Sequence, residues 1–184
     1  DLTQAIPRNE GYSYPLLVAT TPGYFSSSVI KLLVVGQQTN GWHGIFDEKC
    51  NDKAIDELMA LYRKFNSGES CKKSLIMKAG QELQSKINPG SDRSGFMWSN
   101  IVRVDRAGKR PSAIESVLAK IPWLFQEISI LKPDVIAFFT GTDYDDRLIS
   151  TFPGIALTAV PGFPSNMLSR LKHPSLPERT FRTY

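Results

Sequence analysis

The chain has 184 residues, of which 41% are hydrophobic and 22% charged, a composition typical of a globular protein rather than a disordered one. No apolar run approaches the roughly 20 residues that a membrane-spanning helix needs. The net charge of +4 permits an anionic partner such as nucleic acid but is far below that of an obligate polyanion binder. We expect a single domain over residues 1–184, with residues 1–29 as an N-terminal extension packed on it.

The N-terminal residues and the cysteines bear on location and cofactors. Residues 1–10 are mixed and polar and lack the basic start and apolar stretch of a signal peptide. They favour a cytoplasmic protein, unless a leader was removed before this sequence begins. Cys50 and Cys71 are too few for a disulfide framework, and their separation matches no zinc-ligand spacing. We therefore expect free structural thiols, no metal and no cofactor.

Three apolar runs rich in β-forming residues predict buried strands at residues 30–35, 101–104 and 135–139. Such runs are typical of strands covered on both faces, as in a parallel sheet between layers of helices. Residues 155–160 and 180–184 are candidates for two further strands.

Helical spacing of apolar residues predicts helices between these strands, at residues 52–65, 71–87 and 112–131. The last of them opens with the capping-box pattern of Ser112 and Glu115. Alternating strands and helices predict a three-layer α/β/α sandwich with a central, mainly parallel sheet of four strands. In such sheets ligands bind in the loops beyond the carboxyl ends of the strands.

The first such loop follows the strand predicted at residues 30–35 and reads Gly36-Gln37-Gln38-Thr39-Asn40-Gly41-Trp42. Its glycines let the backbone approach a ligand, and its three amide side chains can each donate and accept hydrogen bonds. The glycine spacing is not Gly-x-Gly-x-x-Gly and no Lys-Ser/Thr pair follows, so neither dinucleotide nor P-loop binding is supported. The loop predicts a polar pocket, with an ordinary polar turn as the alternative.

Two further segments contain candidate functional residues. Trp98-Ser99-Asn100 stands just ahead of the strand predicted at residues 101–104, and an Asn amide can read a base edge through paired donor and acceptor atoms. A turn residue that bonds its own backbone is the alternative. His173-Pro174-Ser175 holds one of the two histidines, the other being His43, and histidine is the usual acid–base group near neutral pH. A surface histidine is the alternative there. No Gly-x-Ser-x-Gly elbow supports a serine hydrolase.

In order and spacing these motifs resemble those of the uracil-DNA glycosylase superfamily, from about Lys31 to the end of the sequence. Gly36-Gln37-Gln38 is similar to the superfamily's first motif, which follows a core strand and contains the water-positioning acid or amide. Ser99-Asn100-Ile101-Val102 resembles the segment whose Asn reads the uracil edge. Residues 131–136, followed by Thr140-Gly141, are similar to the passage from a helix through a strand to a glycine turn.

The resemblance implies recognition of a base flipped out of single- or double-stranded DNA, and we expect the protein to be a monomer. It implies hydrolysis of the N-glycosidic bond of uracil, or of another deaminated or damaged base, as in base excision repair. Asn100 would pair with the base edge and Trp42 or Phe46 would stack on its face. Backbone amides of Gln37 and Gln38 would approach a carbonyl oxygen. The base-binding residues implied are Gly36, Gln37, Trp42, Phe46 and Asn100.

The implied catalytic residues are Gln38 or Asn40, which would position water against the sugar cation, and a histidine that would stabilise charge on the departing base. Many members have Asp, Asn or Glu where Gln38 stands, and an amide cannot accept a proton as a carboxylate does. The histidine is either His173 or a residue beyond Tyr184. Residues 165–172 look helical or looped, whereas Thr180 to Tyr184 resembles the strand that precedes this histidine in the superfamily. Two cysteines cannot hold the four-thiolate iron–sulfur cluster of one branch.

Phosphate contacts are expected from the small-residue loops 91–95 and 161–165, for which ordinary surface turns are the alternative. The residues implied are Ser91, Arg93, Ser94 and Ser165. Two other classes of function stay open, and so does the choice between DNA and RNA. One is a catalytically weak or inactive module that binds nucleic acid or a nucleobase in the same pocket, which Gln38 favours. The other is an unrelated small-molecule enzyme on a flavodoxin-like sheet, which an absence of basic surface around the pocket would favour.

Overall fold

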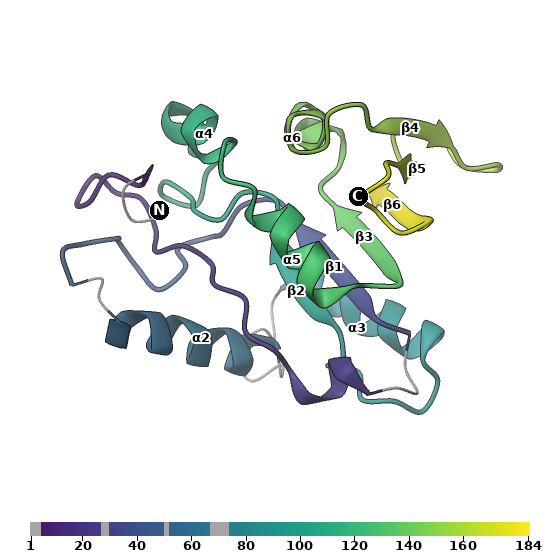
Figure 1. The fold of residues 1–184 in the computed structure, drawn as a ribbon, viewed down its shortest axis with the longest axis horizontal. Coiled ribbons are helices and arrows are strands. Elements are labelled where there is room, and N and C mark those ends of the chain that lie inside the picture. The colour runs from purple at the N-terminus through teal and green to yellow at the C-terminus, as the bar shows by residue number, and fades with distance from the viewer. Residues whose placement is uncertain (1–4, 27–29, 50–51, 67–73) are drawn as a thin grey trace.

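The computed structural model describes residues 5–26, 30–49, 52–66 and 74–184. It contains a sheet of six strands in the order β2-β1-β3-β6-β5-β4 (Figure 1). Four neighbours are parallel: β2 (Met97–Asn100), β1 (Leu32–Gly36), β3 (Val135–Phe139) and β6 (Arg179–Thr183). Two antiparallel strands extend the sheet beyond β6: β5 (Leu168–Lys172) and β4 (Ala156–Ala159). The predicted α/β class and mainly parallel sheet are confirmed, whereas the sheet is wider than the four strands expected.

The second predicted strand is displaced in the structure. The prediction of a strand at residues 101–104 is wrong, because β2 ends at Asn100 and the chain then leaves the ladder. The apolar residues that follow are buried against the N-terminal segment, where the Leu16 N–H donates to the Arg103 carbonyl oxygen at 2.8 Å. An apolar run can mark burial without marking a strand. Asn100 is therefore the last residue of a strand instead of standing ahead of one.

The interpretation of residues 165–172 as helix or loop is also wrong, because β5 occupies Leu168–Lys172. Buried Ser169 and Leu171 alternate with exposed Arg170 and Lys172, which is the two-residue period of a strand with one face on the core. This alternation is visible in the sequence and indicates the strand. β5 completes an antiparallel hairpin with β4, which Figure 1 shows extending from the margin of the molecule.

The helices that join the strands agree partly with the predictions. α2 (Asp52–Asn66) matches the predicted helix closely. α3 (Leu75–Ile87) begins after Ser74, whose side chain accepts a hydrogen bond from the Met77 N–H as an N-cap. Residues 71–73 of the predicted helix, and both cysteines, lie outside the described residues. A helix that was not predicted, α6 (Asp145–Thr151), follows a short 3₁₀ turn, η2 (Thr142–Tyr144).

The helix predicted over residues 112–131 is in fact two helices, α4 (Ser112–Leu118) and α5 (Trp123–Leu131). Pro122 stands between them, and proline ends a helix because it has no N–H and its ring clashes with the preceding turn. The predicted capping box is wrong as well, since the helix cap lacks a side-chain hydrogen bond and Glu115 binds Arg110.

Helices cover both faces of the sheet around β2. Trp98 and Ser99 are successive strand residues, so their side chains point to opposite faces. The Trp98 ring stacks on Tyr62 of α2, with centroids 5.8 Å apart, and the Ser99 hydroxyl donates to a Glu127 carboxylate oxygen of α5 at 3.1 Å. Among the helices within the described residues, none combines the length and the apolar composition of a membrane-spanning segment.

The loops that follow β1, β2 and β3 meet at the carboxyl edge of the sheet, as the sequence predicts. The Ile101 N–H donates to the Gly36 carbonyl oxygen at 2.9 Å, which joins the first two loops. The Gln37 side-chain amide donates to the Thr140 carbonyl oxygen at 3.0 Å, which joins the first and third. This edge of the parallel strands positions the candidate site.

Candidate functional site

A cavity of about 450 Å³ opens at this carboxyl edge, a volume within the range of small-molecule sites. Six of the residues predicted for the site line it: Gly36, Gln37, Gln38, Asn40, Trp42 and Asn100. The other lining residues, absent from that prediction, are Thr39, Phe65, Ser74, Ile76, Trp98 and Phe139. None of these twelve side chains titrates near neutral pH. The described lining therefore offers amides, hydroxyls and aromatic rings, without a general acid or base.

Asn100 lies in the cavity wall at the end of β2, where 3% of its surface is exposed. Its side chain makes no hydrogen bond to any described residue. The amide oxygen lies against Gly36, so close that a Cβ at position 36 would stand 2.5 Å from Oδ1. A larger residue at position 36 would therefore displace the Asn100 amide, or the end of the Ile76 side chain, which lies 2.6 Å from the same Cβ position. Because this amide lines the cavity and bonds no described residue, its oxygen and nitrogen are available to a ligand or a water there.

Aromatic side chains form one wall of the cavity. Trp42 packs edge-on against Phe65 and Trp98, with ring centroids 5.5 Å away in both cases. Phe65 and Trp98 are 4.9 Å apart. Phe46, the other predicted stacking residue, is fully buried and lies outside the lining, against the ring of Tyr14. Trp42 is therefore the predicted stacking residue that a flat ligand in this cavity would meet.

Asp105 holds the loop that carries the predicted motif, although only 1% of its own surface is exposed. One carboxylate oxygen accepts hydrogen bonds from the Thr39 hydroxyl and the Gly41 N–H, each at 2.8 Å. The other accepts from the Gly108 N–H at 2.7 Å. The sequence reasoning missed this residue, and the signal was a carboxylate directly after a buried apolar run. Asp105 ties the loops after β1 and β2 together.

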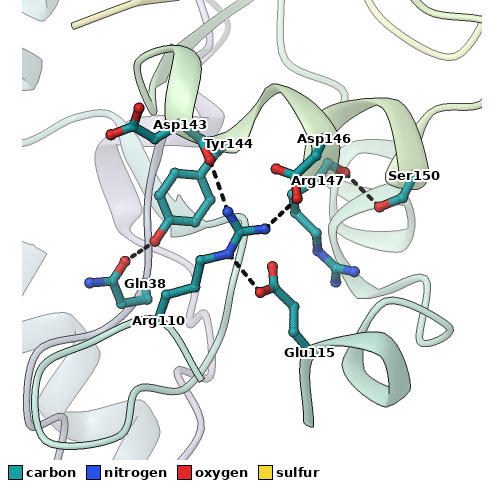
Figure 2. Close-up of polar contacts among 8 residues, drawn as sticks. All are labelled: Gln38, Arg110, Glu115, Asp143, Tyr144, Asp146, Arg147 and Ser150. Atoms are coloured by element: carbon teal, nitrogen blue, oxygen red, sulfur yellow. Dashed lines mark hydrogen bonds and ion pairs between the residues drawn. The ribbon is translucent and has the colours of Figure 1, made fainter. Parts of the chain in front are cut away.

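The Gln38 side chain is held at both ends of its amide. Its nitrogen donates to the Gly108 carbonyl oxygen at 3.2 Å, and its oxygen accepts a hydrogen bond from the Tyr144 hydroxyl (Figure 2). An amide has two N–H donors and two acceptor lone pairs, so one of each remains for a ligand or a water. The Gly108 carbonyl needs a donor opposite it, which suits Gln at this position and disfavours Glu.

Arg110 supports Tyr144 from the side away from Gln38, as Figure 2 shows. Its guanidinium carbon lies 4.6 Å from the centre of the Tyr144 ring. The same guanidinium donates to Glu115 at 2.6 Å and to Asp146 at 2.7 Å. The hydrogen bond that Arg110 donates to Glu115 is the largest cause that raises the pKa of Arg110, so the guanidinium stays charged. This network links α4, α6 and the motif loop.

The Tyr144 hydroxyl remains a donor at all ordinary pH values, because burial raises its pKa to about 12. We expect Tyr144→Phe to lower the free energy of unfolding by about 1 kcal/mol, since it removes the hydrogen bond to Gln38. The difference from the wild type should be constant below about pH 10. Above it the difference should shrink as pH rises, because unfolded tyrosine ionises before the folded one does. Urea unfolding at several pH values measures both effects.

The matched control for this prediction is Tyr184→Phe, because Tyr184 is 72% exposed. Removal of its hydroxyl should change the free energy of unfolding by less than about 0.5 kcal/mol. Equal effects of the two substitutions would contradict the anchoring of Gln38 by Tyr144.

His173 lies far from the cavity along the strand direction. It does follow a strand, β5, but β5 runs antiparallel to β6, so its last residue lies at the amino edge of the parallel strands. There the His173 ring packs against Phe152, 5.5 Å away, and its Nδ1 accepts a hydrogen bond from the Ser175 N–H at 3.2 Å. The structure thus does not bring His173 together with the Gly36–Trp42 loop.

The predicted phosphate-binding residues divide between the two edges of the sheet. Ser91, Arg93 and Ser94 precede the parallel strand β2 and lie at its amino end, away from the cavity. Ser165 precedes the antiparallel strand β5 and lies at the carboxyl edge, where its carbonyl oxygen accepts a hydrogen bond from Arg182 at 2.9 Å. Only Ser165 of these four shares an edge with the cavity.

The sequence matches no protein-family model, and comparison with curated proteins finds no relative. Within the described residues, no group of three or more His, Cys, Asp and Glu side chains is placed to hold a metal ion.

Proposed function

We propose that the cavity binds a single nucleobase turned out of a DNA strand, and that the protein is a uracil-DNA glycosylase-like N-glycosylase. The observation that carries this proposal is the Asn100 amide, which is buried in the cavity wall and bonded to no described residue. The resemblance of the motifs around Gly36 and Asn100 to the uracil-DNA glycosylase superfamily supports the same reading.

The contacts available in the cavity match a planar base with both donors and acceptors on its edge. The Asn100 side chain offers an acceptor oxygen and a donor nitrogen side by side, which complements the adjacent N–H and C=O groups of uracil. Trp42 supplies a ring for stacking, a contact worth about 1–3 kcal/mol per base. Together these contacts offset the few kcal/mol that flipping a base out of the stack costs.

For hydrolysis, the cavity contributes orientation and electrostatic stabilisation. The remaining N–H and lone pair of Gln38 can orient a water, and fixed dipoles of this kind carry much of the rate enhancement in many enzymes. Since Tyr144 and Gly108 hold the amide in place, it is preorganised for that role. The described lining contains no carboxylate and no histidine that could take a proton.

A second candidate function is a module that binds a flipped base without hydrolysing it. The specific observation in its favour is the absence of any acid or base from the described lining of the cavity. Both candidates require the same base contacts, and they differ only in whether the glycosidic bond breaks.

The test uses labelled single- and double-stranded oligonucleotides that contain one uracil or one hypoxanthine, with thymine-containing oligonucleotides as controls. After incubation with the full chain, hot alkali reveals abasic sites as strand breaks. We expect breaks at uracil and none at thymine. Preferential binding of the uracil-containing strand without breaks would instead support the binding module. Neither breaks nor preferential binding would contradict both candidates.

A further inference from the structure

Beyond β3, one face of the sheet carries exposed cations on neighbouring strands. The register pairs Arg170 of β5 with Phe181 of β6, and continuing it places Lys172 directly beside Arg179. The side chains of Arg170, Lys172 and Arg179 are exposed. These three cations and Phe181 define a basic face.

No acidic residue shares this basic face at any register position of the strands. On the outer side, β4 places Thr158 beside Arg170 and Ala156 beside Lys172. On the inner side, β3 places Val135 beside Arg179. None of the three cations forms an ion pair with a described residue. Glu178 precedes β6 and lines a depression together with Arg170 and Lys172, although it forms no ion pair with either of them. Like charges directly across a strand pair destabilise a sheet, and one nearby carboxylate against three cations leaves the face with a net positive charge that suits an anionic partner.

The basic face also offers a surface on which bases can stack. The guanidinium of Arg170 lies over the Phe181 ring, 5.6 Å from its centre. Both side chains line a groove of about 360 Å³ with Lys172 and residues of the β4–β5 hairpin. Aromatic rings and guanidinium planes are the groups that proteins use to stack exposed bases.

The basic face is continuous with the candidate site through β3 and β6. Phe139 lines the cavity and is paired with Thr183, two residues after Phe181 and on the same side of the sheet. A nucleic-acid strand with one base in the cavity can therefore run from Phe139 across β6 to the cations of β5.

We propose that the basic face binds single-stranded nucleic acid that flanks the base held in the cavity. Lys172 and Arg179 contact phosphates, and Arg170 on Phe181 stacks with a base. A single strand fits better than a duplex because duplex bases are already stacked and would leave the Arg170 platform unused. The nature of the partner rests on the proposed function, whereas the charge and register of the face do not.

The test measures binding of a labelled oligothymidylate of roughly 15 nucleotides by fluorescence anisotropy at several salt concentrations. It contains no uracil, so binding is independent of base recognition. We expect Lys172→Gln/Arg179→Gln to raise Kd about tenfold and to reduce the salt dependence of log K by about 1.4, since each lost phosphate contact contributes about 0.7 for single strands. Arg170→Lys should weaken binding with an unchanged salt dependence, because it keeps the charge and loses the planar group.

The matched control is Lys86→Gln/Lys120→Gln, which removes the same charge from exposed positions on α3 and after α4. Equal weakening by the two double variants, or equal loss of binding to a blunt duplex, would overturn the proposal. Folding is checked separately, since relief of the like-charged pair should leave the Tm unchanged or about a degree higher. Two results together would overturn only this inference: the wild-type protein excises uracil, and the Lys172→Gln/Arg179→Gln variant binds oligothymidylate as tightly as the wild type does. If the wild-type protein binds oligothymidylate through the basic face but neither binds nor cleaves at uracil preferentially, only the proposed function is overturned.

Discussion

Replacement of Asn100 by alanine should lower kcat/KM for uracil excision by about 100- to 1000-fold, the usual cost of losing one preorganised contact of this kind. It should leave the free energy of unfolding nearly unchanged. The physical reason is that the Asn100 amide bonds no described residue, so its removal leaves no described donor or acceptor without a partner. Single-turnover cleavage of a uracil-containing oligonucleotide measures the first effect, and urea unfolding measures the second.

The control for this prediction is Ser99→Ala, in the neighbouring residue of β2. Ser99 points to the opposite face and donates to Glu127, so its loss should cost stability and spare excision. The two substitutions should therefore have opposite profiles. If kcat/KM of Asn100→Ala lay within about threefold of the wild-type value, a difference of only about 0.7 kcal/mol, the role of Asn100 in base binding would be contradicted.

Replacement of Asp105 by alanine should lower the free energy of unfolding by about 3–5 kcal/mol, because it leaves the buried Thr39 hydroxyl and the part-buried N–H groups of Gly41 and Gly108 without their acceptor. That is a large part of the roughly 5–15 kcal/mol that holds a typical domain together. The motif loop should lose its anchor, so uracil excision should fall with stability. The free energy of unfolding of Asp105→Asn should lie between those of the wild type and Asp105→Ala. The Asn amide keeps one acceptor oxygen but turns its N–H donors toward another donor. Urea unfolding followed by tryptophan fluorescence measures the loss.

Asp92 provides the matched control for Asp105. Its carboxylate also accepts a backbone hydrogen bond, from the Ser94 N–H at 2.9 Å, but in an exposed turn. Asp92→Ala should cost less than about 1 kcal/mol, because water replaces the lost acceptor. If Asp105→Ala were no more destabilising than Asp92→Ala, the anchoring role of Asp105 would be wrong.

The sequence predicted best those elements whose pattern reflects local burial. β1, β3 and α2 lie where continuous apolar runs or helical periodicity place them. The break at Pro122 and the alternation in β5 were visible locally but were outweighed by the longer apolar pattern and by a proline-rich neighbourhood. The prediction of a strand after Asn100 was wrong for a different reason. Its apolar residues are buried by the N-terminal segment, which lies far away in the sequence.

The sequence by itself determined the α/β class and the polar chemistry of the loop after β1, because both depend on residue types and short-range spacing. Only the tertiary structure decided which polar residues meet. It placed Asn100 at the end of β2 inside the cavity, buried Asp105 behind the motif loop, and carried His173 to the opposite edge. The physical reason is strand direction and pairing: the antiparallel course of β5 reverses which end of the strand faces the cavity, and no local pattern encodes that reversal.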